Sequence, residues 1–275
     1  MSKTFEVLRI FYKSFIGQSP IAIYQMGKVG SSTIYATLKQ LNANPVYHVH
    51  FLRKSEIERM QKKYKDAGLS QVYPHLIQSK IIAGLVKNKI LKWNIITIVR
   101  DPMAAKLSHL FHNPKVHHKY LFDKNGALDK ERALAIAIEK INEIDLQTDF
   151  VYNWINDEFN NYLKINVFDF SFNKKKGFQV INTGGHVILI IQTESINNAL
   201  VDAIKEMKIS SKELCIQIAN ENKNQEFSEI YEYVKKNLMI SEKKAREIYN
   251  CKYVHHFYTD DFVEDRIKFW TTRNK

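Results

Sequence analysis

A short apolar run followed by two closely spaced glycines, within residues 21–35, constrains this chain most. Residues 21–24 suit a β-strand, Gly27 and Gly30 allow a tight turn, and three hydroxyl residues then open a helical pattern. Backbone N–H groups of such a turn, and of the helix N-terminus after it, point toward a bound anion. The stretch therefore predicts a phosphate or sulfate site to which Lys28 adds a positive charge. It is not the ATPase pattern, in which the lysine follows the last glycine, because Lys28 precedes Gly30.

Composition narrows the class of protein. A chain of 275 residues with 45% hydrophobic and 25% charged residues can bury a sizeable core, and no apolar run is long enough for a transmembrane helix. The net charge of +12 favours anionic partners, although the lysines are spread along the chain. Two distant cysteines fit a reducing compartment. Residues 1–18 are too charged for a secretory signal, so we expect a cytoplasmic protein. An amphipathic helix there either packs on its own domain or makes peripheral contact with the inner face of a membrane.

Hydrophobic patterns alternate between strands and helices along the chain. We predict strands over 21–24, 46–51, 94–99, 167–170 and 187–191, and helices over 31–41, 55–67, 74–88, 104–111, 128–144 and 150–163. The run at 94–99 suits a central parallel strand covered on both faces. We expect the hydroxyl residues 31–33 and Ser55 to cap their helices, residues 42–45 to end the first helix, and Gly68 to end the second. The pattern predicts one α/β domain over 1–275 with a mostly parallel sheet, helical elaborations at about 112–164 and 197–275, and a helical C-terminal part.

A second candidate phosphate-binding stretch follows the strand predicted at 94–99. Arg100 comes directly after that strand, Asp101 and Pro102 follow, and Ser108 lies about two turns into the next helix. Ligands gather at the carboxyl ends of strands in open α/β sheets, and a guanidinium there can fork onto a phosphate. The chain therefore carries two anion-binding motifs about one βαβ unit apart.

This pair of motifs resembles the P-loop sulfotransferases, which use 3′-phosphoadenosine 5′-phosphosulfate (PAPS). In that family the first motif holds the 5′-phosphosulfate, and an R-D-P-x-x-R-x-x-S stretch holds the 3′-phosphate. The resemblance implies a three-layer P-loop-type fold, in which a mostly parallel sheet is flanked by helices. It also implies that PAPS is bound by Lys28, Val29, Gly30, Ser31, Ser32, Thr33, Arg100 and Ser108. We expect Lys106 to replace the family's second arginine and so to keep the charge.

Two further stretches resemble a narrower group. The segment 248–262, I-Y-N-C-K-Y-V-H-H-F-Y-T-D-D-F, looks like the C-terminal signature of bacterial sulfotransferase-like capsular polysaccharide synthesis proteins. The segment 46–52, V-Y-H-V-H-F-L, is similar to theirs as well. Together with the two motifs, the resemblance covers most of the chain.

Sulfuryl transfer needs a base for the acceptor hydroxyl and positive charge for the transferred group. Lys28 is the candidate for the charge. For the base we favour His50, because it lies near the carboxyl end of its strand and histidine titrates near neutral pH. His48 lies on the same face and either orients His50 or acts as the base itself. His75 and an acidic residue are the remaining alternatives.

The resemblance thus predicts a PAPS-dependent O-sulfotransferase acting on a hydroxyl of a saccharide, a capsular or lipid-linked glycan. We expect PAPS and a glycan as partners, no metal and no nucleic acid; the His112, His117 and His118 cluster suits a solvated loop rather than a metal site. One alternative is a nucleotide-dependent kinase. Another is a non-catalytic basic protein that binds anions or nucleotides in capsule assembly. Segment 114–125 and parts of 128–163 are predicted to line the acceptor cleft. The basic loop 174–177 is an open alternative for a segment that closes over the nucleotide.

Overall fold

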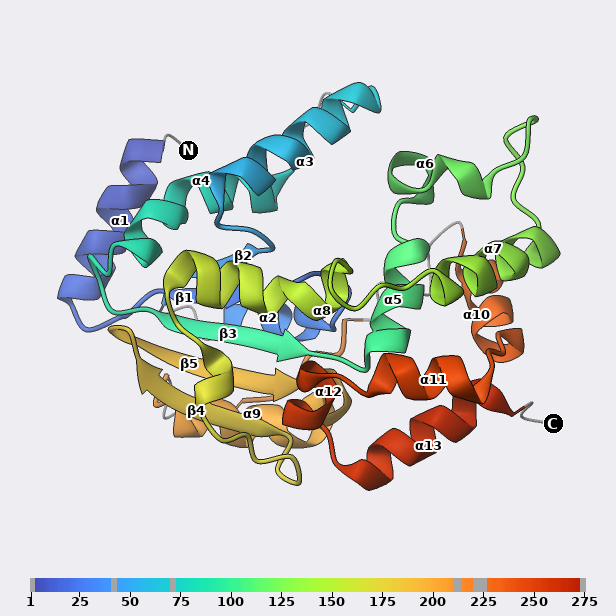
Figure 1. Cartoon of the computed structure of the whole chain (residues 1–275). Helices are drawn as coiled ribbons and strands as arrows, with labels where there is room; N and C mark the ends of the chain where they lie inside the picture. The colour runs from blue at the N-terminus through green and yellow to red at the C-terminus, as the bar shows by residue number, and fades with distance from the viewer. Residues whose placement is uncertain (1–2, 41–43, 70–72, 210–213, 220–226, 273–275) are drawn as a thin grey trace. The chain divides into compact units, whose positions relative to one another are not determined.

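A computed structural model of the chain describes residues 3–40, 44–69, 73–209, 214–219 and 227–272 (Figure 1). Contacts within the chain divide it into two compact units. The first consists of Met1–Val99 and Trp154–Ala219, and the second of Arg100–Asn153 and Asn220–Lys275. The expectation of one domain over residues 1–275 stays a prediction.

The first unit is built on a five-stranded sheet with the strand order β2-β1-β3-β5-β4. Its strands are β1 (Ile21–Tyr24), β2 (Val46–Val49), β3 (Asn94–Val99), β4 (Phe178–Thr183) and β5 (His186–Gln192). The first four strands of that order pair in parallel, and β4 pairs antiparallel with β5. Every residue of β1, β3 and β5 is buried, as expected for apolar strands in the middle of a sheet. The predicted α/β architecture with a mostly parallel sheet is confirmed.

Helices of the same unit pack on this sheet and on one another. They are α1 (Lys3–Phe15), α2 (Ser31–Lys39), α3 (Lys54–Asp66), α4 (Pro74–Lys87) and α9 (Ile196–Glu206). Helix α2 packs on β1 and β2, α4 on β2, and α9 on β4 and β5, whereas α1 and α3 both pack on α4 (Figure 1). No helix in the described part of the chain is long and apolar enough to cross a bilayer.

The second unit is helical where it is described. It holds α5 (Pro102–Leu110), α6 (Pro114–His117), a 3₁₀ turn (Lys119–Leu121), α7 (Lys130–Asn142), most of α8 (Phe150–Ile155), α10 (Ser228–Asn237), α11 (Glu242–Tyr249), α12 (Lys252–Phe257) and α13 (Asp260–Thr271). Helix α7 packs on α10 and α5, and α11 packs on α13 and α5. Described residues of the predicted helical C-terminal part confirm that prediction, except for the irregular segment 214–219; residues 210–213, 220–226 and 273–275 lie outside the description.

One predicted strand is wrong, and one strand of the sheet was not predicted. Residues 167–170 do not form a strand but a 3₁₀ turn, Val167–Asp169, because the side chain of Asn166 accepts from Phe168 N at 3.3 Å and fixes a local turn. Strand β4 was not predicted from the sequence. A two-glycine turn joins β4 to β5, with Gly184 at φ +58° and Gly185 at φ +80°, as a tight hairpin requires.

Several helix boundaries also differ from the prediction. The hydroxyl residues 31–33 lie inside α2, whose N-cap is Gly30, and Ser55 lies inside α3, whose N-cap is Arg53, so neither hydroxyl cap exists. Gly68 does follow α3 with φ +76°, as predicted. The segment expected as a histidine loop contains the short helix α6. The stretch predicted as one helix over 150–163 is α8 followed by a π-helix, Asn156–Leu163. Residues 41–43, where the first helix was expected to end, lie outside the described chain.

Candidate functional site

The glycine loop joins the end of β1 to the start of α2 through a strongly curved backbone. Gly27 (φ +90°), Lys28 (φ +55°) and Gly30 (φ +80°) all adopt left-handed conformations. A Cβ on Gly30 would lie 3.2 Å from Cδ1 of Ile196, so the loop is both bent and closely packed there. This curvature brings successive backbone amides toward one side, which is the geometry of an anion-binding nest at a helix N-terminus.

Thr193, which directly follows β5, ties this loop to the sheet. Its Oγ1 lies 2.9 Å from the carbonyl oxygen of Val29 and 3.1 Å from that of Val99, the last residue of β3. A hydroxyl has one hydrogen to donate, so the two carbonyls share it. The sequence analysis did not identify this residue.

Gln25, the residue after β1, organises the polar side chains beside the loop. It is fully buried, and its Oε1 accepts from the backbone N–H of Gly27, which fixes which end of the amide is oxygen. Its Nε2 then lies 3.0 Å from Oγ of Ser31, 3.0 Å from Nε2 of His48 and 2.9 Å from Nδ1 of His50. Nε2 of His48 also lies 2.9 Å from Oγ of Ser31. Gln25 was not among the predicted site residues.

The number of hydrogens available in this cluster bears on which ring nitrogen of His50 carries one. The amide of Gln25 has two hydrogens for three neighbours, so one of those neighbours must find its partner elsewhere. His50 has such a partner, because its Nδ1 lies 3.1 Å from the backbone carbonyl oxygen of Gln25, which can only accept. If Nδ1 of His50 carries the hydrogen, the buried backbone carbonyl of Gln25 gains a donor. The side-chain amide of Gln25 then donates its two hydrogens to Ser31 and His48. The Nε2 atom of His50 then carries the lone pair that a general base needs.

The three histidines proposed as alternative bases lie side by side. Ring centroids are 5.2 Å apart for His48 and His50 and 4.9 Å apart for His50 and His75. Burial lowers the pKa of His75, because removal from water penalises the charged imidazolium. The aromatic ring of Tyr73 lies 5.7 Å from that of His75. All three side chains therefore belong to one cluster at the carboxyl end of β2, and which of them acts as a base stays a prediction.

A second network, which the sequence analysis missed, holds the chain after His50. Nε1 of Trp154 donates to the carbonyl oxygen of His50 at 3.0 Å. Glu158, a fully buried residue of the π-helix, accepts from Leu52 N at 3.0 Å, from Arg53 Nε at 2.7 Å and from the hydroxyl of Tyr24. The segment carrying His50 is thus anchored to α8 and the π-helix by hydrogen bonds on either side of Phe51. The available sequence signal was the pair of acidic residues, Asp157 and Glu158, between aromatic and aliphatic positions of the stretch 150–163.

In the second unit, the Arg100–Asp101–Pro102 motif is fixed by two tyrosines from the C-terminal helices. Arg100 N donates to the hydroxyl of Tyr253, and that hydroxyl donates back to the carbonyl oxygen of Arg100, each at 3.0 Å. Asp101 caps α5 through Met103 N at 3.0 Å, and it also accepts from Tyr249 Oη at 2.7 Å and Arg266 Nε at 2.6 Å. Burial, and then the negative charge of Asp101, raise the pKa of Tyr249 well above its usual value. The segment that resembled a family signature therefore holds the second motif in position.

Two other predicted positions also lie in this unit. Ser108 is buried on α5, two turns after Arg100, and Arg100 is itself partly exposed. Lys106, which we expected to replace the family's second arginine, forms an ion pair with Asp149. Counted from Arg100, however, the R-D-P-x-x-R-x-x-S spacing places that arginine at Ala105, so Lys106 lies one position later and has a structural partner within the unit.

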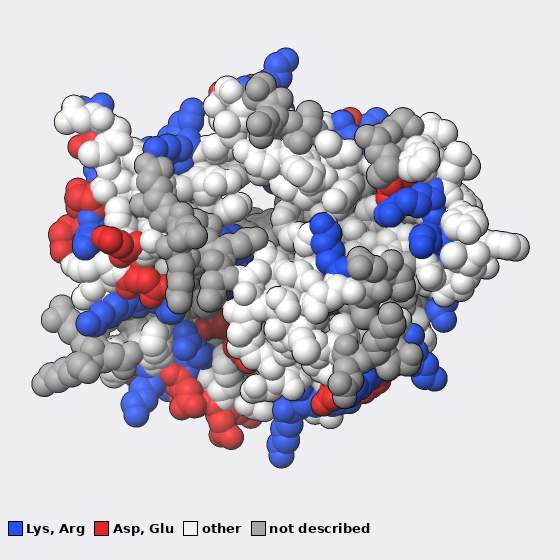
Figure 2. All heavy atoms as spheres, turned by 180° about the vertical axis from the view of Figure 1, so that it is seen from behind, with Lys and Arg blue, Asp and Glu red and all other residues white. Residues whose placement is uncertain are grey.

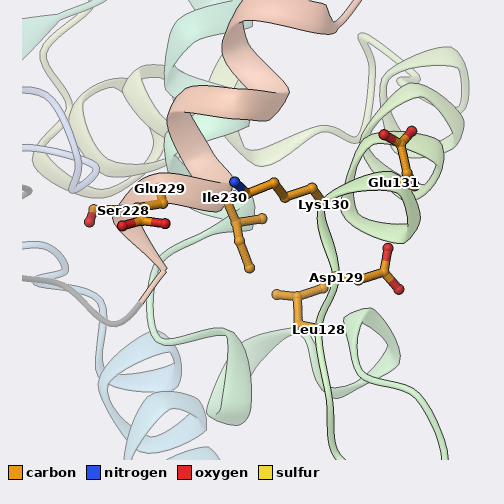
Figure 3. A pocket seen from close by; sticks show the side chains of 7 residues that line it. All are labelled: Leu128, Asp129, Lys130, Glu131, Ser228, Glu229 and Ile230. Carbon is orange, nitrogen blue, oxygen red and sulfur yellow. The ribbon is translucent and has the colours of Figure 1, made fainter.

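A cavity of about 610 Å³ lies elsewhere in the second unit, between the N-terminal ends of α7 and α10 (Figure 3). Its lining holds three acidic residues and one lysine, a balance that disfavours anions, and none of the predicted site residues borders it. It is formed by Leu128, Asp129, Lys130, Glu131, Ser228, Glu229 and Ile230. Figure 2 shows Lys and Arg side chains scattered over the face in view, among acidic and uncharged ones. The described residues contain no group of three or more His, Cys, Asp or Glu side chains placed to hold a metal ion.

Comparison with known proteins gives one match. Residues 116–259 match the family described as "Putative capsular polysaccharide synthesis protein". No curated protein and no solved structure matches the chain. Because the matched residues make up more than half of the 275 residues, the chain belongs to this capsular polysaccharide synthesis family.

Proposed function

We propose that the protein is a PAPS-dependent sulfotransferase that transfers a sulfuryl group to a hydroxyl of a saccharide. One observation carries the proposal: a curved glycine loop at a helix N-terminus lies against a histidine cluster, at the carboxyl ends of parallel strands. An anion-binding nest next to candidate proton acceptors is what transfer of an anionic group to a hydroxyl requires. Membership of a capsular polysaccharide synthesis family supports a glycan as the acceptor.

In this proposal the loop binds the 5′-phosphosulfate. The amides of residues 28–32 and the hydroxyls of Ser31, Ser32 and Thr33 donate to its oxygens, and the ammonium of Lys28 neutralises charge that moves onto the bridging oxygen as the S–O bond breaks. By the resemblance to P-loop sulfotransferases, Arg100 and Ser108 bind the 3′-phosphate, and the sheet with its loop is a P-loop-type fold. Tyr253 fixes the backbone of Arg100 through two hydrogen bonds, and this restricts the positions that the guanidinium can reach.

His50 is assigned as the base. Its Nδ1 donates to the carbonyl of Gln25, and its Nε2 takes the proton of the acceptor hydroxyl while the hydroxyl oxygen forms the new bond to sulfur. The bond between sulfur and the bridging oxygen breaks, and 3′-phosphoadenosine 5′-phosphate leaves. Gln25 acts as a positioning residue, because its backbone carbonyl accepts from Nδ1 of His50 and its side-chain amide contacts both His48 and Ser31.

Calorimetry with 3′-phosphoadenosine 5′-phosphate tests the binding half of the proposal. Lys28→Ala and Arg100→Ala should each weaken binding by about 10- to 100-fold, since a hydrogen bond to a charged group contributes roughly 1.5–3 kcal/mol. Lys65→Ala on α3 and Arg59→Ala, both exposed, are the matched controls and should bind as the unaltered chain does. Failure of the unaltered chain to bind, or equal binding by all four variants, would refute the assignment.

Transfer of labelled sulfate from PAPS to a panel of glycans tests the chemical half. His50→Ala should abolish transfer while leaving nucleotide affinity unchanged. Transfer that instead depends on Mg-ATP would replace the proposal by a nucleotide-dependent kinase. Salt-sensitive polyanion binding that survives Lys28→Ala and Arg100→Ala, without transfer, would indicate a non-catalytic anion-binding protein.

A further inference from the structure

Helix α1 has two apolar faces, and only one of them is used inside the first unit. Ile10 is fully buried, and Glu6 is buried beside it. The carboxylate of Glu6 accepts a hydrogen bond from the hydroxyl of Tyr47 on β2, and α1 packs against α4 (Figure 1). This face anchors the helix to its own unit through the burial of Ile10 and through Oε1 of Glu6, which accepts the hydroxyl of Tyr47.

The opposite face exposes large apolar side chains. Phe15 is 90% exposed, Leu8 and Tyr12 are each 63% exposed, and Phe5, Phe11 and Ile16 are between 40% and 56% exposed. Positions 5, 8, 12 and 15 follow the three- and four-residue spacing that places side chains on one side of a helix. Positions 11 and 16 widen the same stripe. Five such side chains on α1, with Ile16 directly after its last residue, form an apolar patch of a kind that monomeric proteins rarely leave in water without a use.

The charges on α1 indicate what covers this patch. Glu6 is the helix's acidic residue, and it is buried and paired with Arg9 at 3.0 Å. Its other charged side chains are Lys3, Arg9 and Lys13, which are all basic. The face that α1 presents to solvent is therefore aromatic and aliphatic, and the charged side chains of α1 that remain exposed or half-buried are all basic. That combination suits the interface of a bilayer containing anionic lipids. A second copy of α1 would instead bring like charges together.

We propose that α1 lies on the surface of a membrane containing anionic lipid, with the stripe Phe5, Leu8, Phe11, Tyr12, Phe15 and Ile16 inserted into the interface. Thirteen residues of α-helix span only about 20 Å, less than the hydrocarbon core of about 30 Å, so the helix lies along the surface and does not cross it. The contacts of Glu6 and Ile10 keep the rest of the unit attached to the inserted helix. This inference concerns a surface away from the candidate site and does not depend on its chemistry.

Flotation of the full chain with vesicles tests the proposal. The protein should bind vesicles of phosphatidylcholine with 30% phosphatidylglycerol, and bind pure phosphatidylcholine at least tenfold more weakly. Leu8→Ser combined with Phe15→Ser should lower the partition coefficient about 100-fold, since each substitution removes roughly tenfold of interfacial affinity. Ile90→Ser alters a side chain that is 50% exposed outside α1 and should not change binding.

Two outcomes would overturn the proposal. One is equal vesicle binding by the double variant and the unaltered chain while circular dichroism shows both to be folded. The other is absence of vesicle binding by the unaltered chain. If light scattering then shows a dimer that the double variant converts to a monomer, the stripe is an interface between two copies instead. A fall in vesicle binding between 50 and 300 mM salt would support the electrostatic part of the argument.

Discussion

Two neighbouring acidic residues of the π-helix share one arginine and differ in burial, so they provide a controlled test of how the His50 segment is held. Glu158 is fully buried, and its Oε1 lies 2.7 Å from Arg53 Nε. The side chain of Asp157 is 38% exposed, and its Oδ2 lies 3.3 Å from Arg53 Nη2. Geometry alone would make the two ion pairs similar. Burial predicts that they contribute very differently to stability.

Glu158→Ala removes the acceptor of three donors at once. The N–H of Leu52 is left inside the protein without this acceptor, and the hydroxyl of Tyr24 keeps only the carbonyl oxygen of residue 158 at 3.4 Å; an unsatisfied buried donor costs about 1–3 kcal/mol. The side chain of Arg53 is 29% exposed, so it can recover part of its loss from water. We therefore expect the free energy of unfolding to fall by about 3–5 kcal/mol, the range for breaking a buried ion pair. Asp157→Ala should cost less than about 1 kcal/mol, because solvent screens an exposed pair.

Urea unfolding, followed by tryptophan fluorescence and far-ultraviolet circular dichroism, measures both variants. Trp154 belongs to the same unit as Glu158 and donates to His50, so its emission reports on the region concerned. Glu158→Gln, which keeps the shape and one oxygen, should lie between the two alanine variants. The reasoning fails if Asp157→Ala destabilises as much as Glu158→Ala, or if Glu158→Ala costs less than about 1 kcal/mol.

Three further predictions follow from other contacts. Tyr249→Phe removes the hydroxyl that donates to Asp101 and should lower the free energy of unfolding by about 1–3 kcal/mol in urea; an unchanged midpoint would contradict this. Burial lowers the pKa of His186 from 6.5, so the unfolded chain binds a proton that the folded protein does not. Stability should thus fall as pH drops below about 6.5, and His186→Gln should flatten that fall where the exposed control His255→Gln does not. Gly30→Ala, at φ +80°, should cost about 1 kcal/mol or more by thermal unfolding and weaken nucleotide binding in calorimetry, whereas normal behaviour in both would argue against a strained loop.

The sheet was largely predictable, and its exception has a physical cause. Residues 94–99 and 187–191 are mostly apolar, with Asn94 and Thr97 as the polar exceptions, because a strand covered on both faces has few positions where a polar side chain is favoured. Strand β4 is an edge strand with polar and partly exposed positions such as Gln179 and Asn182, so its hydrophobic signal is weak. The glycine pair before β5 was the better signal for this strand.

In the candidate site, residues with a reactive side chain, such as the histidines, were predicted from the sequence. Residues such as Gln25, which only position other side chains, were missed. Alternation along 46–50 predicted that His48 and His50 share a face, and their rings do lie together. Gln25 has no reactive group, and its importance arises because a buried amide must find partners for its oxygen and both hydrogens. Its partners come from a loop, a helix and a strand that only the fold brings together. No local pattern in the sequence encodes those distances.

The family match and the anion-binding motifs lie in different parts of the chain. The matched residues 116–259 begin after the glycine loop, after His50 and after Arg100. Within each unit, however, the matched stretch supplies side chains that hold a motif-bearing segment: Glu158 holds the residues after His50, and Tyr253 holds the backbone of Arg100. A stretch that only supported the fold would not need to fix those two segments through hydrogen bonds to their backbones. We therefore propose that the matched region positions the candidate site, so substitutions at Glu158 and Tyr253 should alter the proposed transfer without touching the substrate.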